Sequence, residues 1–285
     1  ESYHYFNNRF DHLYGGFSGS INKFPKPHDY SFLMRYYYKT NNHNALEIVK
    51  KSLYEMKKGG IFDQIGYGFH RYSTDTKWLV PHFEKMLYDQ ALLIHAYLDA
   101  YQITKDEFYS QTVHQLCEYI LRDMTDENGG FYSAEDADSQ GEEGVFYIWS
   151  ESELKKVLTK NEYEFIFPIL SISKKGNAIV EGNRVNIPYL KKTIKELSEI
   201  SNENYNDYLI KFNQIRKKIF EYRDLRVHPQ KDDKILTDWN GLMISALARA
   251  SVVLDNENYL NAAKKSADFI IDNLINNDGS LLKRH

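Results

Sequence analysis

The chain has 285 residues, of which 27% are charged, and its net charge of −4 gives no basic field of the kind that attracts nucleic acid. No apolar run approaches the roughly 18 residues of a spanning helix. The single cysteine excludes an internal disulfide and a cysteine-based metal site. We therefore expect neither nucleic acid nor a membrane as partner, and a reducing, cytoplasmic setting. Because the sequence starts at Glu1 rather than Met, we expect a fragment or a processed chain.

Apolar residues at three- and four-residue steps predict pairs of helices along most of the chain. After a mostly irregular stretch over residues 1–27, the expected helices are 29–39, 44–57, 81–103, 107–123, 239–254 and 258–275. Pro81 suits the first position of its helix, where a missing N–H costs nothing. Gly59 and Gly60 are expected to end the helix before them.

Glycine turns punctuate these helix pairs. Each turn places glycine just before an apolar residue, at 15–17, 59–61, 129–131 and 278–281. A helix pair followed by a glycine turn is typical of a helical-hairpin repeat. The irregular spacing predicts insertions between the repeats.

The largest expected insertion spans 131–236. The elements predicted within it are a short strand at 146–149, a helix at 151–158, a β-leaning piece at 176–188 and a charged helix at 204–222. Ser150 and Glu153 have the spacing of a capping box, which marks the start of the helix at 151.

Four motifs closely resemble those of the spermatogenesis-associated, thioredoxin-domain-containing protein family. They are residues 68–73 (GFHRYS), 78–90 (WLVPHFEKMLYDQ), 133–139 (SAEDADS), and 232–236 (DDKIL) together with 239–243 (WNGLM). The resemblance covers essentially the whole chain. It implies a mainly α fold, an (α/α) toroid of helical hairpins forming a partial six-hairpin barrel, with short β-hairpin insertions. That fold is related to six-hairpin glycosidases and N-acylglucosamine 2-epimerases.

The resemblance also indicates two departures from the family. Relatives carry a thioredoxin-like domain with a redox cysteine motif before this region, and they continue with further hairpins after it. We therefore expect one toroid-like domain over 1–285 that forms an incomplete barrel, and a thioredoxin-like domain in full-length relatives.

Because the motifs fall where loops meet inner helices, we expect their polar side chains to line one cleft. The candidate catalytic residues are Glu84, Asp136, His82 and His70. The candidate substrate-binding residues are Asp63, Arg71, Trp78, Glu135, Asp138, Asp233, Trp239 and Asn240. A composition of 23 tyrosines suits a sugar cleft, since one ring offers an apolar face and a hydroxyl.

Glu84 and Asp136 are the acid/base pair that the sequence favours for sugar chemistry. Glu84 is placed in the first helical turn, where the helix dipole favours a carboxylate that acts as base or nucleophile. Asp136 is placed in an acidic, aromatic neighbourhood that raises a carboxyl pKa and suits an acid. Two histidines, His70 and His82, could serve an epimerase instead. Each of these side chains has the alternative of a purely structural hydrogen-bonding role.

No cofactor and no metal are predicted. The spacing of Asp136 and Asp138 imitates an EF-hand, but Tyr147 stands where the loop needs a bidentate glutamate. Neither a zinc motif, a dinucleotide-binding motif nor a nucleophile elbow occurs.

Two classes of function remain open. One is an enzyme that binds or processes a sugar or another polar small molecule; the other is a non-catalytic binding or scaffold module that accompanies a thioredoxin-like domain. The last two helices look uncovered, so we also expect a two-fold dimer, or a separate chain that supplies the missing C-terminal half. The side chains of this expected end face are Ala246, Leu247, Ala250, Ile270, Ile271 and Leu274.

Overall fold

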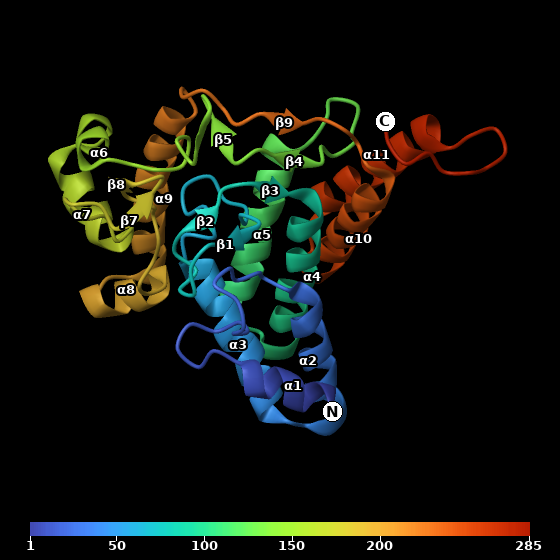
Figure 1. Cartoon of the computed structure of the whole chain (residues 1–285), viewed down its shortest axis with the longest axis horizontal. Helices are drawn as coiled ribbons and strands as arrows, with labels where there is room; N and C mark the ends of the chain where they lie inside the picture. The colour runs from blue at the N-terminus through green and yellow to red at the C-terminus, as the bar shows by residue number, and fades with distance from the viewer.

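Three antiparallel helical hairpins form the frame of the computed structural model, which describes all residues 1–285 (Figure 1). The hairpins are α2 (Pro27–Thr40) with α3 (His43–Lys58), α4 (Leu87–Thr104) with α5 (Glu107–Asp123), and α10 (Thr237–Val253) with α11 (Glu257–Leu274). The first helices of the hairpins pack side by side, α2 against α4 and α4 against α10, and each second helix covers its own partner. This confirms the predicted mainly α fold, with the hairpin layers of an (α/α) toroid.

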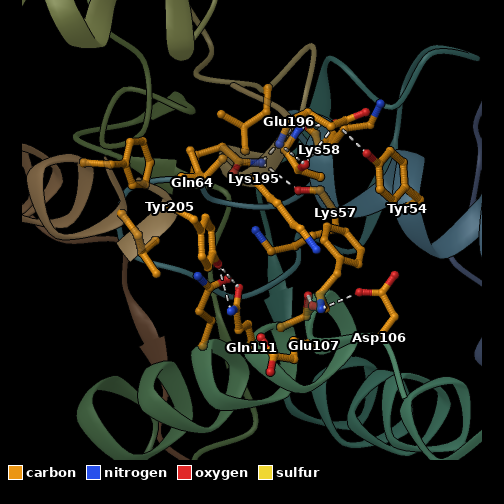
Figure 2. Close-up of a pocket in the computed structure, with 18 of the residues that line it drawn as sticks. Tyr54, Lys57, Lys58, Gln64, Asp106, Glu107, Gln111, Lys195, Glu196 and Tyr205 are labelled. Atoms are coloured by element: carbon orange, nitrogen blue, oxygen red, sulfur yellow. Dashed lines mark hydrogen bonds between the residues drawn. The ribbon is translucent and has the colours of Figure 1, made fainter. Parts of the chain in front are cut away.

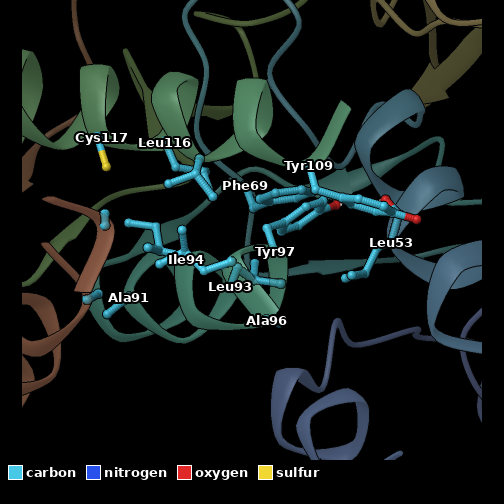
Figure 3. Packing of buried hydrophobic residues seen from close by; sticks show 14 of the residues in the cluster. Leu53, Phe69, Ala91, Leu93, Ile94, Ala96, Tyr97, Tyr109, Leu116 and Cys117 are labelled. Carbon is cyan, nitrogen blue, oxygen red and sulfur yellow. Dashed lines mark hydrogen bonds between the residues drawn. The ribbon is translucent and has the colours of Figure 1, made fainter. Parts of the chain in front are cut away.

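Helix α4 lies at the centre of this frame, and its side chains are buried on most sides. Leu93, Ile94 and Tyr97 have no exposed surface and pack with Leu116 of α5 and Phe69 of the preceding loop (Figure 3). Each such burial contributes about 1.5–3 kcal/mol. The lone Cys117 is buried in the same core. The position of α4 therefore fixes where the loops at its ends lie.

Four tight turns are each closed by a short backbone bridge; the first turn follows α1, and the other three each follow a hairpin. The bridges pair Phe10 with Phe17, Phe62 with Phe69, Thr125 with Phe131, and Ile275 with Leu281. This agrees with the repeat read from the sequence, except in the second turn. There the equivalent glycine is Gly68, at φ 83°, whereas Gly59 has φ −64° and does not form a left-handed cap.

Several predicted boundaries are wrong, each for a local reason. The N-terminal stretch contains a helix, α1 (Ser2–Arg9), which contacts α2 and α3. Pro81 does not begin a helix but lies in β2 (Pro81–His82), and α4 begins only at Leu87. Residues 146–149 are turns rather than a strand, with one bridge from Trp149 to Asn186.

The segment between α5 and α10 packs around a second, smaller core. Its helices are α6 (Glu151–Val157), α7 (Lys160–Ile169), α8 (Ile194–Ser201) and α9 (Tyr205–Arg223), and its longest strands are β7 (Ala178–Val180) and β8 (Asn183–Val185). The capping box of Ser150 and Glu153, the β-leaning piece and the charged helix are confirmed. Helices α7 and α8 were not predicted.

Short strands carry the motifs. They are β1 (Tyr72–Ser73), β2, β3 (Lys85–Met86), β4 (Ala134–Glu135), β5 (Asp138–Ser139), β6 (Glu142–Glu143) and β9 (Lys231–Asp232). The sheet β3–β4–β9 is antiparallel, with Lys85 opposite Glu135 and Glu135 opposite Lys231. It crosses one end of the helices, next to the first turn of α4 (Figure 1).

The end face expected to drive a dimer is largely covered within the chain. Ala246, Leu247, Ala250 and Leu274 have no exposed surface, because α4 and α11 pack on α10 and the loop residue Ile235 packs on Leu274. Of the six side chains named for that face, Ile271 is the one that is mostly exposed. Four of the six side chains named for that face are therefore covered within the chain, and the dimer stays a prediction.

Candidate functional site

The sheet β3–β4–β9 brings three of the four motifs to the same end of the hairpins. Residues 78–90 supply β3, residues 133–139 supply β4, and residues 232–236 continue from β9. The fourth motif, 68–73, joins them through β1, where Tyr72 pairs with His82 of β2. Polar side chains that are far apart in the sequence therefore meet here, some buried and some open to solvent.

A buried ion cluster holds this end of the molecule together. Asp63 accepts two hydrogen bonds of 2.9 Å from the Arg223 guanidinium and one of 3.0 Å from the Lys85 ammonium. Burial alone would raise the pKa of Asp63, but Arg223 and Lys85 hold it well below its usual range. Asp63 therefore links its turn to α9 as a permanent carboxylate, with no surface left for a ligand.

Glu135 belongs to the same buried region. Its carboxylate accepts a hydrogen bond of 2.6 Å from the Tyr119 hydroxyl, and its Oε1 lies 3.9 Å from the Lys231 ammonium. The Lys85 ammonium also lies over the Tyr119 ring at 4.5 Å. Glu135 thus has partners on α5 and β9, which suits the structural role that the sequence left open.

His70 is fully enclosed. Its Nδ1 lies 2.8 Å from the Phe83 carbonyl oxygen, and the rings of Phe83 and Tyr147 pack edge-on against it. Burial, together with the nearby Lys85 charge, lowers the pKa of His70 to about 3. The imidazole is neutral near pH 7 and orders the loop.

The open part of the site is built around His82 and Glu84. The Nδ1–H of His82 donates a 2.7 Å hydrogen bond to Glu143, and its Nε2 lies 3.9 Å from Glu84. Glu84 also accepts a 2.8 Å hydrogen bond from Arg71, and the His82 ring stacks on Tyr72. All of these side chains keep some exposure. A histidine held by one carboxylate, with its second nitrogen free, can take up or release a proton.

Glu84 lies in the link between β2 and β3, not in the first turn of a helix. The helix-dipole argument for its ionised form is therefore wrong. The Arg71 guanidinium, half-exposed beside it, supplies the positive charge instead.

Asp89 is the residue of this site that the sequence reasoning missed. It lies in the first turn of α4, and its Oδ2 is buried with no hydrogen-bond partner. Burial raises the pKa of Asp89 to about 7, with Glu84 adding to the rise and Arg71 opposing it. A carboxyl group that titrates near neutrality beside a charged cluster is a strong candidate for acid/base chemistry. The signal that could have identified it is its place between Tyr88 and Gln90 in the motif 78–90.

Two other candidates have structural surroundings. Trp78 has no exposed surface, and its Nε1–H donates to the Tyr14 carbonyl oxygen at 2.8 Å. Asn240 is also fully buried, with its amide bonded to both backbone groups of Phe131. Neither side chain reaches a cleft.

The remaining candidates differ in their exposure. Asp136 and Asp138 are exposed, and Asp136 accepts a hydrogen bond from the Asp138 backbone N–H. Asp233 is exposed and lines a small cavity of about 220 Å³ with Asp126 and Tyr132. Trp239 is half-buried, and its ring meets that of Tyr88 edge-on with the ring centroids 4.8 Å apart. Tyr88 directly precedes Asp89 in the sequence.

Neither a metal cluster nor a membrane helix is found. No three or more His, Cys, Asp and Glu side chains are grouped so that they could hold a metal ion. None of the helices combines the length and the apolar character that crossing a bilayer needs.

Comparisons with solved structures return sugar-acting enzymes at low similarity. Cellobiose 2-epimerase from Spirochaeta thermophila is 14% identical, with a TM-score of 0.43 over 99% of this chain and 84% of that one. A family 76 α-mannanase from Bacteroides thetaiotaomicron is 14% identical, with a TM-score of 0.42 over 99% and 69%.

Sequence comparison gives closer relatives. No family model matches the chain. Spermatogenesis-associated protein 20 of Homo sapiens is 35% identical over 286 residues, which cover 92% of this chain and 36% of the human protein. The Rattus norvegicus protein of the same name is 34% identical, over 96% and 38%. The chain thus spans little more than a third of the length of these relatives. Across nearly all of its own length it is homologous to a segment of spermatogenesis-associated protein 20, which confirms the resemblance read from its motifs.

Proposed function

We propose that this end of the hairpins binds a sugar or a similar polyol and carries out acid/base chemistry on it, with Asp89 as the acid. The observation that carries the proposal is the buried, unpartnered Oδ2 of Asp89 together with its pKa near 7. At neutral pH such a group is present in both forms, so it can give and regain a proton within one cycle.

His82 supplies the second proton-transfer group. Glu143 fixes the imidazole so that Nε2 is the free nitrogen. The half-exposed Arg71 and Glu84 beside it can hydrogen-bond to hydroxyl groups. The half-buried Trp239 ring, which meets Tyr88 edge-on, offers a flat apolar face of the kind on which sugar rings stack. We assign the acid role to Asp89 rather than to Asp136, because the Oδ2 of Asp89 is buried without a partner whereas Asp136 is exposed.

Proton exchange into sugars tests the proposal. The protein is incubated in D₂O with a panel of reducing aldoses, ketoses and disaccharides, and NMR follows both deuterium at the carbon beside the carbonyl and cleavage of glycosidic bonds. Deuterium exchange identifies epimerase- or isomerase-type chemistry, and cleavage identifies hydrolysis. Asp89→Asn and His82→Gln should each lower the rate at least about 100-fold, the usual size of an acid/base contribution.

Asp268→Asn is the matched control, since Asp268 is an exposed carboxylate on α11 far along the chain from the motifs. It should leave the rate unchanged. Absence of exchange, of cleavage and of saturation-transfer signals for every sugar would reject the proposal and favour the non-catalytic module.

A further inference from the structure

A large cavity lies away from the motifs, between the outer helices of two hairpins and the segment α8–α9 (Figure 2). Its volume is about 700 Å³, which is the size of a small-molecule site. Its apolar lining includes Tyr54, Tyr67, Phe108, Leu190, Ile194 and Phe212. None of the acid/base groups described above lines it. The cavity is therefore a site separate from the acid/base groups.

Lys57, in the last turn of α3, reaches this cavity from a buried position. Its ammonium lies 3.7 Å from the centroid of the Phe62 ring and has no hydrogen bond or ion pair within the protein. A buried ammonium without a partner is costly, since burial removes its hydration. A ligand that pairs with it would remove that cost.

The neighbouring polar groups are already occupied. Gln64 donates to the carbonyl oxygens of Lys57 and Gly59, which closes the end of α3. The Glu196 carboxylate accepts a hydrogen bond of 2.6 Å from Tyr54 and also caps α8 through Thr193. Among the buried charged groups of the lining, Lys57 is the one without a hydrogen bond or ion pair, since Lys58 pairs with Glu55. The other charged side chains that line the cavity, Lys105, Asp106, Glu107, Lys195 and Glu199, are exposed.

A second unmatched atom is found in the lining. The Oε1 of Gln115 on α5 is buried and has no hydrogen-bond partner. Together with Lys57 it gives the cavity two polar groups that lack hydrogen bonds, beside the aromatic and aliphatic side chains of the lining. This is the pattern of a site that orients a ligand by a few polar groups and holds it by its apolar surface.

We propose that this cavity binds a small molecule with an apolar body and a single anionic head group, the head group pairing with Lys57. The proposal is independent of the acid/base site, because no residue of that site lines the cavity. A carboxylate and a phosphate share the required charge, so the experiment must separate them.

Fluorescence of 1-anilinonaphthalene-8-sulfonate provides the direct probe, because the dye has an aromatic body and one sulfonate. We expect saturable binding to the full chain and displacement by decanoate or decyl phosphate, the two possible head groups. Whichever competes at the lower concentration identifies the head group. Decanol, which has the same body without charge, should compete at least tenfold more weakly than the better of the two.

Two variants test the assignment to Lys57. Lys57→Met removes a buried unpaired charge, so the fold should persist while the affinity for the dye drops at least tenfold. Lys217→Met, at an exposed lysine of α9, is the matched control and should bind as the parent does. Leu209→Trp, which fills the cavity from a half-exposed position, should abolish saturable binding.

The pH dependence gives a separate readout. Burial lowers the pKa of Lys57 to about 7, with Arg216 adding to the fall and Asp63 opposing it. Affinity for decanoate should therefore be highest below pH 7 and decrease above it, at most tenfold per pH unit. Equal competition by decanol and decanoate, or unchanged dye binding in either Lys57→Met or Leu209→Trp, would overturn the proposal.

Discussion

Gln90 of α4 and Asn240 of α10 occupy equivalent places in neighbouring hairpins. Each lies three residues after the first residue of its helix. The Gln90 amide bonds to both the N–H and the carbonyl oxygen of Phe69, at 2.8 and 2.7 Å. The Asn240 amide does the same to Phe131, at 2.8 and 3.0 Å. The same arrangement thus fastens these two tight turns to the inner helices that follow them.

Removing either amide should destabilise the protein strongly. Gln90→Ala and Asn240→Ala each leave a buried backbone N–H and carbonyl without a partner, at about 1–3 kcal/mol per group. Urea unfolding should show a loss of about 2–5 kcal/mol in each variant, whereas Gln214→Ala at an exposed site of α9 should cost less than about 0.5 kcal/mol. Equal stability of all three would show that the amides do not hold the turns.

Asp63 should be required for folding at any pH where carboxylates are ionised. Asp63→Asn leaves Arg223 and Lys85 buried without their counter-charge, which costs about 3–5 kcal/mol. Because its folded pKa is depressed, Asp63 stabilises the parent above its unfolded pKa of about 3.9 and ceases to do so as pH falls through the lower folded value. Between pH 7 and pH 3, the urea concentration at the unfolding midpoint should therefore be well below the parent's for Asp63→Asn. The difference between the two midpoints should become smaller only at the acid end of this range.

His70 should make the protein sensitive to mild acid. Its folded pKa of about 3 lies below the unfolded value of about 6.5, so protonation favours the unfolded chain. The stability contributed by the neutral ring is complete above pH 6.5 and is lost as pH falls toward 3, by up to about 1.4 kcal/mol per unit. From pH 7 to pH 5, the free energy of unfolding should decrease by about 2 kcal/mol less in His70→Asn than in the parent. Parallel curves for the two proteins would contradict this.

Asp89 should cost stability while serving function. Its folded pKa of about 7 exceeds the unfolded value of about 3.9, so its contribution is favourable at low pH and is lost as pH rises from about 4 to 7. Asp89→Asn should therefore be more stable than the parent at pH 8, by about 2–4 kcal/mol, with the difference vanishing near pH 4. Asp268→Asn should show no such trend. A variant that is less stable at pH 8 would indicate that the ionised carboxylate has an unseen partner.

The helix pairs could be read from the sequence because their signal is local. Apolar steps of three and four residues predicted the six hairpin helices, and the Asp106 side chain caps α5. Two helices of the segment between α5 and α10, namely α7 and α8, were not predicted. Helix α7 contains Pro168, which favours a break, and α8 has only eight residues.

The site was harder to predict because its contacts cross long distances in the chain. Glu143 is 61 residues from His82, and Arg223 is 160 residues from Asp63. No periodicity relates such pairs. The sequence therefore predicted that the motifs lie together, but not which of their side chains are buried. Asp89 was overlooked for a related reason: an acidic residue in a first helical turn is common, and its enclosure depends on the packed neighbours.

The strand pairing of β4 with β9 has a consequence for how such a protein can change over evolutionary time. Ala134 lies opposite Asp232 and Glu135 opposite Lys231, so the chain leaves the hairpin frame and returns to it at the same point. The segment between these residues therefore begins and ends at the same pair of strands. Lengthening a loop whose ends stay fixed costs little, about 0.6 kcal/mol for each doubling. Residues 136–230 can therefore be enlarged, trimmed or exchanged among descendants without altering the spacing of the helices, provided that their contacts with the frame are kept or replaced. Arg223–Asp63, Glu143–His82 and Glu196–Tyr54 are among these contacts.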